Sequence, residues 1–179
     1  SLAEKHLDRL DFLLQSLVKM SRLETGVIRI HSVTSDLRTA LSGAVAAVVP
    51  KAEKKNIRLS VRCGSVFLRH DRKWTEEAVF NLLDNAVRYT PVGGQITLTA
   101  FREGDRLTIA VEDSGPGFSP EALARGEQAF FTSDASRPQE GHMGMGLYFA
   151  GQTAKRHGGA LHLANTGLGA RAELVLPIN

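Results

Sequence analysis

The chain has 179 residues, of which 42% are hydrophobic and 23% charged, and a formal net charge of +3. These values are typical of one globular domain and exclude a largely disordered chain. The basic residues form no dense run, so we expect no nucleic-acid partner. The single cysteine, Cys63, excludes an internal disulfide, and no apolar stretch is long enough to span a bilayer.

Residues 2–24 are predicted to form one long amphipathic helix that ends near Gly26. The apolar stripe along this helix must be buried, either against the rest of the domain or against a second helix in a helical hairpin or dimer stalk. The second alternative is favoured because the stripe follows a heptad. The chain begins inside this helical pattern without a methionine, so we expect a fragment of a larger protein. The heptad positions are Ala3, Leu7, Leu10, Leu14 and Leu17.

The remaining elements are predicted from alternation, helical periodicity and capping residues. The order predicts an α+β fold, a two-layer sandwich of mixed but mostly antiparallel strands covered by about three helices. In chain order we expect a short strand or extended connection at 27–31; a helix capped by Ser35 or Asp36 that runs to about 49 and is ended by Pro50; strands at 57–61 and 66–68; and a helix at 72–88 capped by Asp71. There follow a hairpin of strands 95–101 and 106–112; a loop at 114–143 with a short helix near 120–124; a helix at 144–157; and strands at 160–165 and 170–177.

Two asparagines, Asn81 and Asn85, lie on one face of the predicted helix 72–88 because they are four residues apart. An amide oxygen can bind Mg²⁺ or one of its waters without adding charge beside a polyphosphate. Arg88 is close enough to contact a phosphate, and Tyr89 could cover a flat base. The alternative for each is an ordinary exposed or packed side chain, and Asp84 is expected to be structural or to face solvent.

A strand end followed by a glycine turn forms the second cluster, Asp113-Ser-Gly-Pro-Gly117. The Asp113 carboxylate could accept a hydrogen bond from an exocyclic amine and so distinguish adenine from guanine. Gly115 and Gly117 let the backbone approach a ligand closely. The alternative is a common Asp-Ser-Gly-Pro turn.

The third cluster, Gly144-Met145-Gly146-Leu147, opens a predicted helix. Helix N-termini bind phosphate through N–H groups and the positive end of the helix dipole. Glycine-rich helix starts also occur for packing alone. Side-chain amides and bare N–H groups together nevertheless favour a site for a polyphosphate and its magnesium ion.

In this order and spacing, the clusters resemble the ATP-binding catalytic domain of sensor histidine kinases. That domain belongs to the superfamily of DNA gyrase, heat-shock chaperone and mismatch-repair ATPases. The sequence from Asn81 to Tyr89 is similar to the N box, Asp113 to Gly117 to the first glycine box, and Gly144 to Leu147 to the second. Phe130 and Phe131 stand where the family has an F box.

The resemblance implies the Bergerat ATP-binding fold, with ATP and Mg²⁺ as cofactors. By this analogy Asn81 and Asn85 bind the metal ion, and all the residues named in the boxes bind the nucleotide. Residues 1–26 would be the second helix of the dimerisation domain, 27–34 a linker and 35–179 the catalytic domain, with a mobile ATP lid at about 126–143.

The implied reaction is transfer of the γ-phosphoryl group of ATP to a histidine on a phosphoacceptor helix of the same kinase dimer, and then to a response regulator. The parent protein would be a membrane-anchored homodimer acting at the cytoplasmic face, and this segment would be soluble. No histidine here matches the phosphoacceptor pattern, and His6 is rejected because Leu-Asp-Arg follows it. We therefore assign no catalytic residue and expect no autophosphorylation by the segment alone.

The sequence departs from the family at His142-Met143, where small residues often precede the second glycine box. Two other functions stay open. A gyrase-like or chaperone-like ATPase would place a glutamate where Asn81 stands, because an amide cannot accept a proton from water. An anti-sigma-type nucleotide-binding module would phosphorylate serine on a protein partner and would not need the heptad helix.

Overall fold

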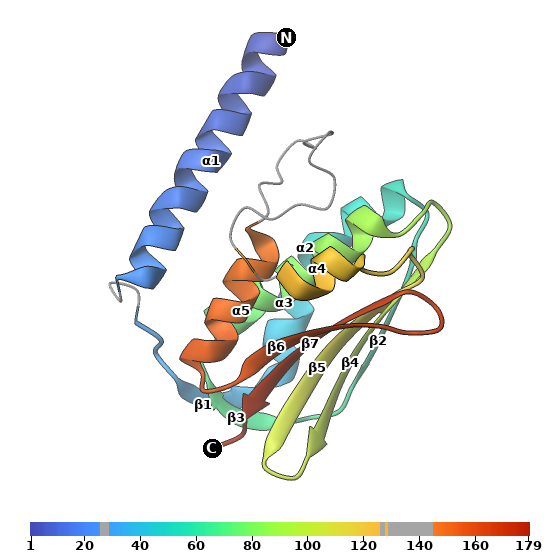
Figure 1. Ribbon diagram of the computed structural model, residues 1–179. Coiled ribbons are helices and arrows are strands. Elements are labelled where there is room, and N and C mark those ends of the chain that lie inside the picture. The colour runs from blue at the N-terminus through green and yellow to red at the C-terminus, as the bar shows by residue number, and fades with distance from the viewer. Residues whose placement is uncertain (26–28, 126–127, 129–144) are drawn as a thin grey trace.

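The structure is a computed structural model that describes residues 1–25, 29–125, 128 and 145–179. A sheet forms one layer and helices form the other, while α1 projects away from both (Figure 1). The helices are α1 (Leu2–Glu24), α2 (Leu37–Lys54), α3 (Arg72–Tyr89), α4 (Pro120–Arg125) and α5 (Gly146–Arg156). The strands are β1 (Val33–Asp36), β2 (Arg58–Cys63), β3 (Phe67–His70), β4 (Gln95–Glu103), β5 (Arg106–Asp113), β6 (Ala160–Asn165) and β7 (Ala170–Pro177).

The main sheet has the strand order β2-β4-β5-β7-β6. Its first pair, β2 and β4, is parallel, with Arg58 opposite Gln95, and the other three pairs are antiparallel. Between the parallel strands the chain forms β3 and α3, so α3 lies within the crossover connection that such a pair requires. A separate small sheet consists of β1 and β3, which are antiparallel.

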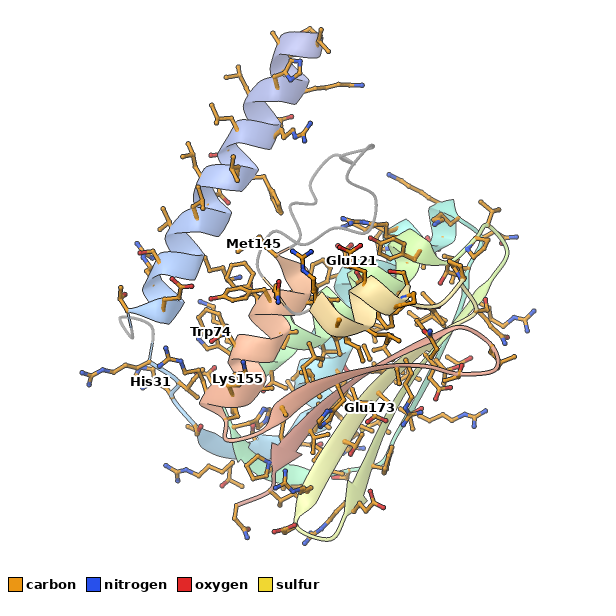
Figure 2. The ribbon with its side chains drawn as sticks, viewed as in Figure 1. His31, Trp74, Glu121, Met145, Lys155 and Glu173 are labelled. Atoms are coloured by element: carbon orange, nitrogen blue, oxygen red, sulfur yellow. The ribbon has the colours of Figure 1, made fainter. Side chains whose placement is uncertain are left out.

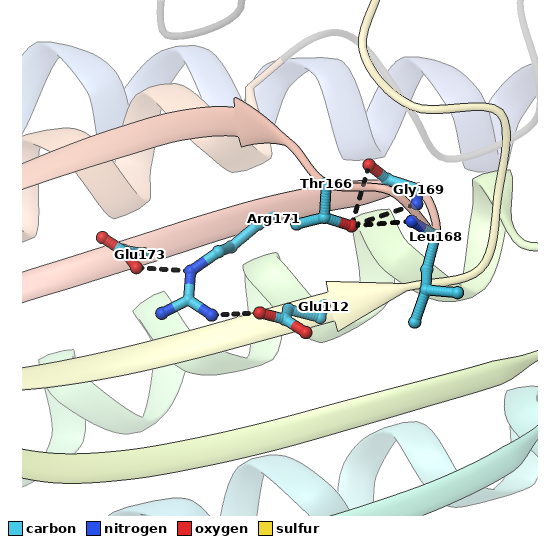
Figure 3. Close-up of polar contacts among 6 residues, drawn as sticks. All are labelled: Glu112, Thr166, Leu168, Gly169, Arg171 and Glu173. Atoms are coloured by element: carbon cyan, nitrogen blue, oxygen red, sulfur yellow. Dashed lines mark hydrogen bonds and ion pairs between the residues drawn. The ribbon is translucent and has the colours of Figure 1, made fainter.

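The core lies between the main sheet and the helices α2, α3 and α5. Side chains alternate along each strand, so Ile96 and Leu98 of β4 are buried under the helices while Thr97 faces the opposite side. On that opposite face, Arg171 of β7 bonds both Glu112 of β5 and Glu173 of its own strand (Figure 3). The predicted two-layer sandwich with a mixed, mostly antiparallel sheet is therefore confirmed.

Near its C-terminal end, the first helix contacts α3 and α5 of the domain. Lys19 forms an ion pair with Glu77 of α3, and its Nζ lies 4.9 Å from the ring centroid of Phe149 in α5. Glu24 accepts a hydrogen bond of 2.9 Å from the hydroxyl of Tyr148. The predicted heptad stripe is uncovered, because Leu7, Leu10, Leu14 and Leu17 are 64%, 51%, 52% and 36% exposed.

Asp71 joins the connection before β1 to the start of α3 and the end of α5. Its carboxylate caps α3 by accepting from the Trp74 N–H at 3.3 Å, and it accepts from the His31 N–H at 2.8 Å. The Asp71 N–H donates to Nε2 of His157 at 3.0 Å, while Nδ1 of the same ring lies 2.8 Å from the Thr153 carbonyl oxygen. The predicted cap at Asp71 is confirmed, with two partners besides the helix.

One predicted helix boundary was wrong. Pro50 does not end the second helix, which continues through it to Lys54. A proline removes one intrahelical hydrogen bond, and the turns on both sides of it are held by the buried side chains of Val48 and Ala52. The strand β1 at Val33–Asp36 was missed, and so was its pairing with β3. The connection at 29–32 is irregular, and the strand predicted at 66–68 spans Phe67–His70.

In the parts of the chain that the structure describes, no helix combines the length and the apolar character needed to cross a membrane.

Replacing Leu98 with alanine tests the position of the core. Leu98 is fully buried, so the variant should lose about 3 kcal/mol of unfolding free energy through lost burial and the cavity left behind. Urea unfolding followed by circular dichroism measures this value. Val92→Ala is the control, because Val92 is 75% exposed and its loss should change stability by less than about 0.5 kcal/mol. A similar small effect at Leu98 would contradict the core described here.

Candidate functional site

Helix α3 carries the first predicted cluster at the edge of its buried face. Its apolar side chains at Ala78, Leu82 and Leu83 lie in the core, and Asn81 and Asn85 are half-buried beside them. Asp84 forms a 2.7 Å ion pair with Lys51 of α2, which confirms a structural role for Asp84. The two asparagines therefore share one face of the helix, as their spacing predicted.

Arg88 ends the polar face of α3 with an incompletely bonded guanidinium group. Its Nε and Nη2 atoms are buried and have no hydrogen-bond partner among the described residues. Burial lowers the pKa of Arg88, and Tyr89 partly offsets this; the guanidinium carbon lies 5.7 Å from the Tyr89 ring centroid. A buried cation with unbonded N–H groups is strongly favoured by an added anion.

The C-terminal end of α3 abuts the first glycine turn. A Cβ atom on Gly115 would lie 2.8 Å from the Tyr89 carbonyl oxygen and 3.0 Å from Oδ1 of Asp113. Only glycine fits this close approach without a shift of backbone. The structure thus brings the first and second predicted clusters into contact, and Gly117 in the same turn adopts a left-handed φ of 81° that glycine tolerates best.

Asp113 is the last residue of β5 and points toward the helical layer, in line with the core residue Val111 two positions earlier. It is 7% exposed. Its Oδ1 accepts from the backbone N–H groups of Gly115 at 2.9 Å and Ala170 at 3.3 Å, and Oδ2 forms no hydrogen bond with the described residues. Burial raises the pKa of Asp113, and the two N–H groups partly counter this rise. The carboxylate is held by one oxygen and can present the other to a ligand.

The third cluster meets the first at the start of α5. The ideal Cβ position of Gly146 lies 3.8 Å from both Cβ and Oδ1 of Asn81, so the first turn of α5 faces the amide of Asn81. Met145, the N-cap residue of α5, is buried, and its side chain makes no capping hydrogen bond. Figure 2 shows Met145 at the N-terminal end of α5. Leu147 packs against the core. Gly144, Phe130 and Phe131 lie outside the described residues.

The three clusters therefore lie together along α3. The glycine turn after Asp113 contacts Tyr89, and Gly146 lies beside Asn81. The described residues contain no group of three or more His, Cys, Asp or Glu side chains that could hold a metal ion. The amide oxygens of Asn81 and Asn85, together with phosphate oxygens, could hold a magnesium ion here. The half-buried amides and the two guanidinium nitrogens of Arg88 that are unpaired among the described residues, Nε and Nη2, fit a phosphate–magnesium pair.

Sequence reasoning missed Lys55, which holds the end of α3 in place. Its Nζ donates to the carbonyl oxygens of Val87 at 2.8 Å and Arg88 at 3.0 Å. Burial lowers the pKa of this amine. A cation at a helix C-terminus satisfies carbonyl groups that lack intrahelical partners and opposes the dipole. The only sequence signal was the lysine-rich segment after the second helix, which gives no indication of its partner.

The family of histidine kinase-, DNA gyrase B- and HSP90-like ATPases matches residues 70–179, a range that contains all three clusters. The chain belongs to this family. Within it, the sequence is similar to those of sensor histidine kinases, and the fold is that of solved histidine kinase structures. One long helix precedes the matched domain. The predicted resemblance is confirmed.

Three proteins illustrate what the chain is similar to. The alginate biosynthesis sensor protein KinB of Pseudomonas aeruginosa is 33% identical over 178 residues, which are 98% of this chain and 29% of KinB. The structure of full-length ShkA in complex with AMPPNP has a TM-score of 0.80 and 26% identity, covering 94% of this chain and 35% of ShkA. The histidine kinase ThkA, in complex with the response regulator protein TrrA, has the same fold, with a TM-score of 0.79 and 19% identity over 99% of this chain and 50% of ThkA. The chain spans less than a third of the length of KinB.

Asp113→Asn should make the ligand-free protein more stable at pH 7 while weakening adenine binding. Because burial raises the pKa of Asp113, its contribution to stability is complete below the ordinary pKa of about 4 and is lost as the pH rises through the folded value. The asparagine keeps an oxygen for the two N–H groups and carries no charge. The melting temperatures of both proteins should therefore differ most at pH 7 and converge toward pH 4.

The matched control is Asp105→Asn in the exposed turn between β4 and β5, which should leave the melting temperature nearly unchanged at both pH values. A variant at position 113 that melts below the wild type at pH 7 would refute the assignment of Asp113 as a carboxylate strained by burial.

Proposed function

We propose that this chain is the catalytic segment of a sensor histidine kinase. It binds Mg·ATP and transfers the γ-phosphoryl group to a histidine on a phosphoacceptor helix that the chain does not contain. The observation that carries the proposal is the convergence of the three clusters along α3, where Asn81 faces Gly146 and the Tyr89 carbonyl meets Gly115. The family match to an ATPase domain and the sensor kinases among its relatives support it.

In the proposed site, each residue binds or orients the nucleotide. The buried carboxylate of Asp113 accepts a hydrogen bond from the exocyclic amine of adenine, a group that guanine lacks at this position. Tyr89 lies against the base, Arg88 contacts phosphate oxygens and the first N–H groups of α5 bind the polyphosphate. Mg²⁺ would neutralise phosphate charge, with Asn81 and Asn85 as its protein ligands. Positioning and charge neutralisation supply most of the catalysis in such a transfer.

The first helix, within residues 1–26, is proposed as the second helix of the dimerisation and phosphoacceptor domain. The exposed heptad leucines support this assignment, because an apolar stripe of that period normally packs on a second helix. Residues 27–34 would then be a linker and 35–179 the catalytic domain, although β1 already begins at Val33. A dimer of the parent, its attachment to the cytoplasmic side of a membrane and a response regulator as the next phosphate acceptor complete the proposal.

Mixing the chain with a separately purified phosphoacceptor domain and ATP labelled at the γ position should place the label on histidine. Asn85→Ala should weaken Mg·ATP binding at least tenfold, which corresponds to about 1.4 kcal/mol, and should reduce labelling. Asn179→Ala at the exposed C-terminus is the matched control and should behave as the wild type. Label on a protein serine would favour the anti-sigma alternative, and a wild type that binds no ATP would sink the proposal.

Steady-state hydrolysis of ATP by the chain alone should be slow. Asn81 occupies the position where the hydrolysing relatives are expected to carry a glutamate, and its amide cannot accept a proton from water. A phosphate-release assay should therefore give turnover far below the ~1 s⁻¹ at the lower end of ordinary enzyme rates. Sustained turnover near or above that rate would instead support the gyrase-like or chaperone-like alternative.

A further inference from the structure

The glycine turn after Asp113 contacts α3 at Gly115 and is held at its other end, at Phe118, by Asn165, the last residue of β6. Oδ1 of Asn165 accepts from the Phe118 N–H at 2.7 Å, and Nδ2 donates to the Phe118 carbonyl oxygen at 2.8 Å. One side chain thus bonds both backbone groups of a residue 47 positions away. The pair of bonds requires a donor and an acceptor side by side, which a carboxamide has and a carboxylate lacks.

Asn165 also touches the glycine that allows the turn. A Cβ atom on Gly117 would lie 2.9 Å from Oδ1 of Asn165, and Gly117 has a left-handed φ of 81°. The side chain of Asn165 therefore packs on Gly117 while it bonds Phe118. These contacts fix the end of the loop that lies farther from Asp113.

The turn that follows Asn165 fixes the other end of the same loop. A Cβ atom on Gly169 would lie 2.2 Å from the carbonyl oxygen of Asp113 and 2.8 Å from that of Gly115, so the two backbones are in direct contact. The next residue, Ala170, donates its N–H to Oδ1 of Asp113 at 3.3 Å. Asn165 and Ala170 face each other as a strand pair, so both ends of the loop are held by one hairpin.

The hairpin turn is internally bonded. Oγ1 of Thr166 accepts from the N–H groups of Leu168 at 3.2 Å and Gly169 at 3.1 Å (Figure 3). The Thr166 N–H donates to the Gly169 carbonyl oxygen at 2.8 Å. Side-chain hydrogen bonds of this kind give a short turn a defined shape. The turn can therefore hold the loop from Asp113 to Phe118 in a fixed position.

We infer that Asn165 is a positioning residue for adenine recognition, acting through the loop from Asp113 to Phe118. This inference rests on the proposed function. Asn165 contacts no part of the nucleotide in this scheme; it holds the loop so that Oδ2 of Asp113 faces the exocyclic amine. Loss of the two hydrogen bonds between Asn165 and Phe118 should weaken the binding of adenine nucleotides specifically. The phosphate-binding groups on α3 and α5 do not depend on these bonds for their position.

The test compares ADP and GDP binding by calorimetry in the 179-residue chain and two variants. Asn165→Ala removes both bonds, and Asn165→Asp places a carboxylate about 2.8 Å from the Phe118 carbonyl oxygen. Both should weaken ADP binding about tenfold, or ~1.4 kcal/mol, and leave the weaker GDP binding nearly unchanged. Leu168→Ala is the control, because its side chain is 69% exposed in the same turn.

A pH series adds a readout that a purely structural role would not give. A protonated carboxyl group has one donor and one acceptor, like the amide it replaces, so the deficit of Asn165→Asp relative to the wild type should narrow between pH 7.5 and pH 5. The deficit of Asn165→Ala should stay constant. The Asp variant carries the test alone if the Ala variant does not fold.

The outcomes separate the two levels of the argument. A wild type that prefers ADP to GDP, with variants that bind ADP equally well, overturns the role of Asn165 and leaves the proposed function standing. Equal losses for ADP and GDP also overturn it, because they would report general destabilisation. A wild type that binds no adenine nucleotide overturns both.

Discussion

The packing of α3 on the main sheet, with α2 and α5 beside it in the same helical layer, is the constraint on which the rest of the structure depends. Its apolar face is fixed against the sheet by side chains such as Leu82 and Leu83. That fixed face leaves Asn81 directed at the first turn of α5 and brings the Tyr89 carbonyl against the glycine turn. Core packing and site geometry are therefore set by the same helix, and a rotation of α3 would disturb both.

The parts of the site that the sequence predicted are those that local chemistry determines. The spacing of Asn81 and Asn85 gives their common face in any helix, and a carboxylate at a strand end before two glycines already indicates a turn near a ligand. The fold class followed from alternation and turn residues over the whole chain. The distances between clusters did not follow, because they depend on how α3 and α5 cross, which no local pattern states.

The residues that the sequence did not reveal act through partners that are distant along the chain. Lys55 bonds carbonyl groups on the next helix, and Asn165 bonds the backbone of Phe118. Neither residue type is unusual at the end of a helix or a strand. The prediction that Pro50 ends the second helix failed although the local effect of a proline is real. Tertiary packing of the surrounding turns outweighs the one lost hydrogen bond.

The parallel pairing of β2 with β4 has a kinetic consequence. To form it, residues 58–63 must align with residues 95–100 while β3 and α3 are enclosed between them. Such non-local pairing incurs its loop-closure entropy before the contacts compensate for it, which makes it a late and slow event in folding. The proposed nucleotide site would then be incomplete in partly folded chains, and a ligand that binds only the complete site should stabilise the whole domain as one cooperative unit.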